Sequence, residues 1–138
     1  MKTISAFLTV ALLVLAGAAH AAPGKRIIVT GEVVDSWCQI TGIMYGLGTA
    51  HHQCALWCAA GGIPVGIKGD DGKIYVVLKI DDDATSVANA RLMRIQTHRV
   101  TAEGDFYERD GLHYLVVSRV VTDEGVVNHT HEEYGVQP

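Results

Sequence analysis

Five stretches of the chain are rich in β-branched and other apolar residues and are bounded by glycine or aspartate, as β-strands commonly are. They cover residues 27–36, 63–68, 73–80, 99–109 and 112–121. Short polar turns at residues 69–72 and 109–111 separate two pairs of these stretches, and each pair therefore predicts a hairpin. The first stretch contains Gly31, where we expect a β-bulge.

Two segments between the strands have the composition of helices. The segment 51–60 contains good helix formers and ends at two glycines, a common helix stop. The preceding residues 39–50 contain three glycines, so we expect no helix there. The segment 84–94 follows the acidic run 81–83 and ends in arginines, which suits the helix dipole and predicts a helix capped by the aspartates.

The order of these elements is strand, insertion, strand, strand, helix, strand, strand. It predicts an all-β fold with small helices, a five-stranded OB-fold-like barrel with a Cys/His-bearing helical insertion between the first two strands. A fragment of a β-sandwich is the alternative, but it would not need the helix after the third strand. We assign residues 22–121 to this domain and residues 122–138 to a polar C-terminal tail packed loosely on it.

The first 21 residues have the features of a signal peptide. Lys2 provides a short positive region, residues 6–18 form an apolar run, and Ala19-His20-Ala21 has the small-x-small form of a cleavage site. The apolar run is shorter than the roughly 20 residues that span a bilayer. We therefore expect cleavage after Ala21, a periplasmic or secreted protein, and no membrane span in the mature chain.

Composition, net charge and motif content limit the classes of function that fit this chain. The chain has 138 residues, of which 49 % are hydrophobic and 19 % charged, so a single compact domain is expected. The formal net charge is −4, and nucleic-acid binding is disfavoured because it needs a basic surface. The chain lacks the G-x-S-x-G, P-loop, H-E-x-x-H and dinucleotide-binding motifs, so we predict no catalytic residues and leave enzymatic activity open.

The residues that could bind a metal lie in the insertion and at the end of the first predicted strand. His51, Cys54 and Cys58 fall within an arc of roughly 60° on one helix, and Cys38 follows the first strand. Thiolates with one imidazole bind soft cations, and an oxidising compartment would oxidise thiols that no metal protects. We therefore predict a metal site made of Cys38, His51, Cys54 and Cys58, with copper handling as the first choice and structural zinc or iron as the second. A metal-exchange or protein partner would accompany copper handling.

Two other functions fit the same residues. A disulfide from Cys38 to Cys54 or Cys58 would staple the insertion, and the barrel would then be a non-catalytic module for a peptide, glycan or protein. A Cys54–Cys58 disulfide fits less well, because side chains at i and i+4 lie about 5–6 Å apart between Cβ atoms. A thiol oxidoreductase is the third possibility, and it requires an exposed cysteine of low pKa.

The segment from Gly31 to Ile67 also resembles a known group of proteins. G-E-V-V-D-S-W-C from residue 31, H-x-x-C-x-x-x-C from residue 51 and G-I-P-V-G from residue 62 are similar to a pattern shared by small secreted bacterial proteins. The resemblance implies an OB-like domain of unsettled activity, in which the cysteines and His51 act as one unit. The C-x-x-x-C spacing also resembles that of periplasmic copper-delivery proteins of the Sco type, whose thioredoxin-like fold does not fit this strand order.

Three other residues and one histidine pair are secondary candidates. Met44, Tyr45 and Trp57 can shield a Cu(I) ion, although such residues more often serve as core or cover. His129 and His131 would share one face of an extended segment and can bind a metal, but a solvated pair is the expectation in a polar tail.

Overall fold

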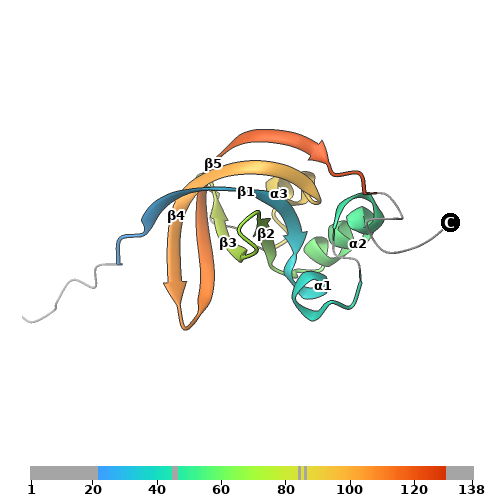
Figure 1. Ribbon diagram of the computed structural model, residues 1–138, viewed down its shortest axis with the longest axis horizontal. Coiled ribbons are helices and arrows are strands. Elements are labelled where there is room, and N and C mark those ends of the chain that lie inside the picture. The colour runs from blue at the N-terminus through green and yellow to red at the C-terminus, as the bar shows by residue number, and fades with distance from the viewer. Residues whose placement is uncertain (1–21, 45–46, 84, 86, 130–138) are drawn as a thin grey trace, which may run out of the picture.

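The computed structural model describes residues 22–44, 47–83, 85 and 87–129 and contains five strands and three helices in that range (Figure 1). The predicted signal peptide, residues 1–21, lies outside the described residues and stays a prediction. The elements in chain order are β1 (Lys25–Asp35), α1 (Ser36–Thr41), α2 (Gly48–Ala60), β2 (Val65–Gly69), β3 (Ile74–Ile80), α3 (Ala90–Arg94), β4 (His98–Arg109) and β5 (Leu112–Val126).

The five strands form one closed sheet in the order β1-β2-β3-β5-β4, with β4 returning to β1. All neighbouring pairs are antiparallel except β3 and β5, which run parallel. The interior is filled by apolar side chains from every strand, and Leu92 of α3 and Ala59 of α2 join them. Sequence patterning thus correctly predicted a mainly β, closed five-stranded architecture.

The two predicted hairpins are confirmed. β2 and β3 pair antiparallel across the turn after Gly69, and β4 and β5 pair across Asp110-Gly111. Both residues of the second turn have positive φ, 54° and 77°, as a tight hairpin requires. β5 continues to Val126, five residues into the segment predicted as a loose tail, because residues 122–126 still pair with β4.

Two helix predictions need correction. Residues 36–41 form α1, although no helix was expected between residues 39 and 50. The glycines of that segment all follow the helix, and the first of them, Gly42, ends it with φ 64°. The helix predicted for residues 84–94 is only Ala90–Arg94, and Asn89 caps it. The acidic run 81–83 forms a turn instead, because Asp81 has φ 50° and the Asp83 carboxylate accepts a hydrogen bond from the Thr85 backbone.

The expected bulge at Gly31 is also wrong. Gly31 is paired in unbroken register with both Gly69 of β2 and Val100 of β4. A Cβ at this position would lie 2.1 Å from the carbonyl oxygen of Lys68. The glycine therefore permits a close approach of two strand backbones.

A Gly31→Ala substitution is expected to destabilise the protein by about 1–3 kcal/mol, because the clash is with backbone and no side chain can move aside. Urea unfolding followed by circular dichroism measures it. Gly61→Ala is the matched control, since Gly61 has φ −76° and an added Cβ there stays 3.3 Å from its nearest neighbour. Equal stability of the two variants would contradict the assignment.

The helical insertion covers one end of the closed sheet. α1 and α2 lie beside the end of β1, whereas the β4–β5 hairpin turn lies at the opposite end (Figure 1). The last five residues of β1 are buried on both faces of the strand as a result. None of the described helices is long and apolar enough to cross a membrane.

Candidate metal centre

The junction between β1 and α1 is organised by Asp35. Its side chain accepts a hydrogen bond from the backbone N–H of Cys38 at 2.9 Å, which makes it the N-cap of α1. Aspartate is among the best N-cap residues because it satisfies an amide that the helix leaves unpaired. The cap fixes the first turn of α1 and with it the position of Cys38, which is 3 % exposed.

The other functional side chains are carried by α2, which is anchored at its start. The backbone N–H of Gly48 donates to the Glu32 carboxylate, and that of Thr49 donates to the Val127 carbonyl at 2.8 Å. A carboxylate at a helix N-terminus is favourable because the helix dipole is positive there. Glu32 is buried, and this burial raises the pKa of its carboxyl.

Two further contacts fix the rotation of α2. The His52 ring nitrogen Nδ1 lies 2.7 Å from the Thr97 hydroxyl, and Ala59 packs into the core of the sheet. The helix ends where predicted, as Gly62 takes φ 94° and the Ile63 amide bonds back to the Cys58 carbonyl. The face that carries His51, Cys54 and Cys58 therefore turns toward β1 and α1.

The three cysteines converge. The Sγ atoms of Cys38, Cys54 and Cys58 all lie within 4.8 Å of one another, and all three residues are free thiols. Cys38 comes from α1 and the other two from α2, so the group forms only when both helices are in place. Sulfur ligands of one tetrahedral ion with bonds of about 2.3 Å lie about 3.8 Å apart, so little movement is needed to enclose an ion.

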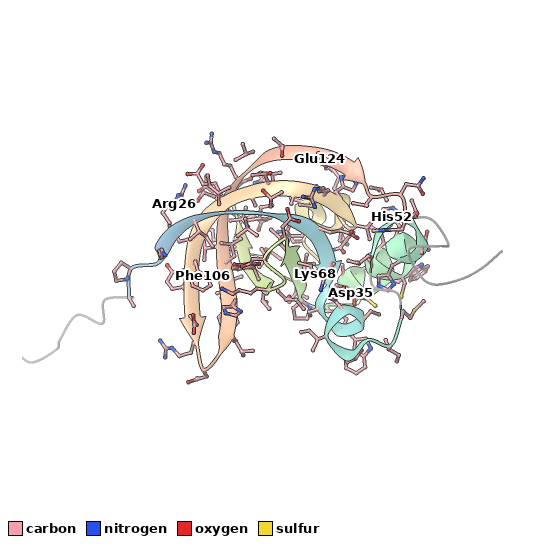
Figure 2. All side chains as sticks on the ribbon, in the orientation of Figure 1. Arg26, Asp35, His52, Lys68, Phe106 and Glu124 are labelled. Atoms are coloured by element: carbon pink, nitrogen blue, oxygen red, sulfur yellow. The ribbon has the colours of Figure 1, made fainter. Side chains whose placement is uncertain are left out.

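His51 belongs to a second, overlapping group. Its Nε2 lies 2.6 Å from the Asp35 carboxylate, and both side chains are fully buried. One ligand atom each of Asp35, Cys38 and His51 lies within 4.8 Å of the others, so Cys38 is shared between the two groups. Figure 2 labels Asp35 at the end of β1, on the side of α1 and α2.

The other ring nitrogen of His51 is left without a hydrogen-bond partner in the described part of the chain, although it is buried. A buried polar atom without a partner costs free energy, and in native proteins it usually has a reason. Metal-bound histidines commonly direct one ring nitrogen at a carboxylate while the other binds the ion. The Asp35–His51 pair has the form of such an arrangement.

The thiols of Cys38 and Cys58 are neutral at neutral pH. Burial raises the pKa of Cys38 to about 12, with the negative Asp35 carboxylate and the neighbouring Cys54 adding to the effect. Burial and Asp35 raise the pKa of Cys58 as well. These two cysteines therefore lack the low pKa that activates a nucleophilic thiol.

The proposed shielding residues take different positions. The Sδ atom of Met44 lies 3.7 Å from Cys54 Sγ, while Trp57 is 72 % exposed and covers little. Tyr45 and His131 lie outside the described residues. His129 approaches the buried Glu32, with Nε2 at 3.5 Å from its carboxylate, and so lies at the start of α2 rather than in the cysteine group.

Asp35 and Glu32 are two residues of the site that were not predicted from the sequence. An available signal for Asp35 was its place three residues before Cys38 at the end of a strand, which is the spacing of an N-cap. Nothing local marked Glu32, because its role arises from the start of α2, 16 residues along the chain.

Comparison with known proteins supplies no relative. No protein-family model, no curated protein and no solved structure matches this chain. The functional conclusion depends on the geometry of its own residues.

Proposed function

We propose that this protein binds a soft metal cation, Cu(I) in the first place, through the thiols of Cys38, Cys54 and Cys58, and that it takes part in copper handling. The observation that carries the proposal is the convergence of three sulfur atoms from two helices within 4.8 Å. Thiolates prefer Cu(I) and Zn²⁺ to harder cations such as Mg²⁺ or Ca²⁺. The three protons leave as the ion binds, as they do in other thiolate sites.

We favour Cu(I) over Zn²⁺ as the bound ion because His51 is not grouped with all three cysteines. Structural zinc needs four ligands in a tetrahedron, and His51 would have to complete the set of three thiols. His51 is grouped with Asp35 and Cys38, whereas Cys54 and Cys58 are grouped with Cys38 alone. Three sulfur ligands suffice for Cu(I), and a zinc site with His51 as its fourth ligand is the second choice.

We also infer an OB-type barrel in a periplasmic or secreted protein. The strand order β1-β2-β3-β5-β4 and the position of α3 between β3 and β4 support the barrel assignment. OB-folds use the loop between their first two strands as one of the binding elements, and the insertion with the cysteines occupies that loop here. The N-terminal segment with signal-peptide features supports export.

The two alternative functions require different chemical states of the cysteines. A disulfide-stapled binding module needs two of the three sulfurs joined, with one thiol left over. A thiol oxidoreductase needs a thiolate at neutral pH, and the raised pKa values of Cys38 and Cys58 argue against either of these two as that thiolate.

The test is an anaerobic titration of the mature, fully reduced protein with Cu(I) in the presence of a chromophoric Cu(I) chelator. We expect one Cu(I) per chain, three alkylatable thiols in the metal-free protein and their protection when copper is bound. Protein isolated from the periplasm without added metal is analysed in parallel by native mass spectrometry. A single free thiol after denaturation, with no bound metal, would instead support the disulfide-stapled module.

A further inference from the structure

A fourth sulfur atom lies beside the cysteine group. Met44 follows α1, and its Sδ is 3.7 Å from the Sγ of Cys54. This separation is close to the roughly 3.8 Å expected between two sulfur ligands of one tetrahedral ion with bonds of about 2.3 Å. Two side chains from different segments thus already have the spacing that a shared ion requires.

The four residues that carry these sulfur atoms differ in exposure. Met44 is 51 % exposed, Cys54 and Cys58 are partly buried, and Cys38 is 3 % exposed. An ion arriving from solvent would meet the thioether first and the buried Cys38 last. This gradient in residue exposure indicates an entry path that passes Met44.

The insertion itself carries no charged ligand for a hard cation, and the Asp35 carboxylate just before it already accepts from the Cys38 amide and lies 2.6 Å from His51. Residues 36–67 contain no Asp, Glu, Lys or Arg, although 19 % of the whole chain is charged. Carboxylates favour hard cations, whereas a thioether is neutral, needs no deprotonation and is a good ligand for Cu(I). An exposed methionine at the mouth of an uncharged insertion would thus favour Cu(I) over Zn²⁺.

We propose that Met44 is a fourth sulfur ligand, which captures Cu(I) at the mouth of the site and gives the site its selectivity against Zn²⁺. This inference rests on the proposed function, since it assumes that the cysteines bind the ion. Copper enters and remains as Cu(I), and no electron is transferred. Met44 contributes through its sulfur, so leucine, which has a similar size and no sulfur, removes the contribution while keeping the apolar surface.

The experiment compares wild-type protein with Met44→Leu in anaerobic Cu(I) and Zn²⁺ competition titrations. We expect Cu(I) affinity to fall about tenfold, the lower end of what changes around a metal site cost, and Zn²⁺ affinity to stay within about twofold. X-ray absorption at the copper edge should count one sulfur ligand fewer in the variant. Met93→Leu, the same substitution at a partly buried position beside the core, is the matched control and should leave both affinities unchanged.

The outcomes separate the two proposals. If wild-type protein binds no Cu(I), the proposed function fails and the role of Met44 fails with it. If wild-type protein binds Cu(I) but Met44→Leu has the same affinity and the same sulfur count, only the role of Met44 is overturned. An equal loss of Cu(I) and Zn²⁺ affinity would show that Met44 supports the local structure and sets no selectivity, which also overturns the inference.

Discussion

Replacing Cys58 by serine is expected to weaken Cu(I) binding at least about a hundredfold, because even changes outside the ligand set can cost 10–100-fold in metal affinity. The serine hydroxyl stays protonated at neutral pH and is a poor ligand for a soft cation. Cys58 is only partly buried, so the fold should tolerate the change. Competition titration against a chromophoric Cu(I) chelator gives the affinity, and thermal unfolding of the metal-free variant checks its stability.

The matched control is Gln53→Ala, an exposed position on the same helix. It should keep the wild-type affinity, since at about 100° per residue it lies at least about 100° around the helix from Cys54 and Cys58. A Cys58→Ser variant with wild-type affinity would contradict the three-thiol site and leave Cys38 and Cys54 to bind the ion with another partner.

The parts of the fold that the sequence predicted well depend on local signals. The β2–β3 and β4–β5 hairpins follow from polar turns between apolar stretches, and in each case the turn fixes the pairing of its neighbours. The end of α2 follows from two adjacent glycines. The closure of β4 onto β1 joins residues more than 60 positions apart, and only the overall order of elements suggested it.

The wrong predictions concern sequence signals that are compatible with two different local structures. Glycines between residues 39 and 50 argued against a helix, yet α1 ends at the first of them, Gly42. The acidic run 81–83 satisfies the rule for a helix cap and also that for a turn, and Asp83 uses its side chain for the turn. The cap of α3 is Asn89, whose side chain accepts from two backbone amides of the helix.

The candidate site was predicted in part for a similar reason. The spacing of His51, Cys54 and Cys58 placed them on one helix face, because the helical period is fixed. Where Cys38 lies relative to that face depends on the packing of α1 against α2, which no spacing rule gives. The pairing of His51 with Asp35 depends on the same packing.

Asp35 links these two helices through the two oxygens of one carboxylate. Oδ1 accepts a hydrogen bond from the backbone amide of Cys38 in α1, while Oδ2 lies 2.6 Å from Nε2 of His51 in α2. The helices that carry the three cysteines are thus held at one fully buried side chain. The position of the sulfur atoms relative to each other should depend on Asp35 even if it never contacts the ion.

Asp35→Ala is therefore expected to destabilise the metal-free protein by about 1.5–5 kcal/mol, from the lost N-cap at about 0.5–2 kcal/mol and the stranded His51 side chain at about 1–3 kcal/mol. Natural domains have only about 5–15 kcal/mol of stability, so the melting temperature should fall by about 5 °C or more. Thermal and urea unfolding followed by circular dichroism measure both quantities.

Asp35→Asn separates the two contributions. Asparagine is an equally good N-cap, so its carbonyl oxygen should keep the bond from the Cys38 amide. Its NH₂ group can face His51 Nε2 only if the ring proton moves to Nδ1, and Nδ1 then has no lone pair for a metal ion. Asp35→Asn should therefore be more stable than Asp35→Ala by about 1 kcal/mol or more. Because the zinc site needs His51 as its fourth ligand, Asp35→Asn should also bind Zn²⁺ about tenfold more weakly than wild type. A loss below about 1 kcal/mol in Asp35→Ala would mean that the carboxylate acts as a cap alone and that the His51 contact does not hold α2.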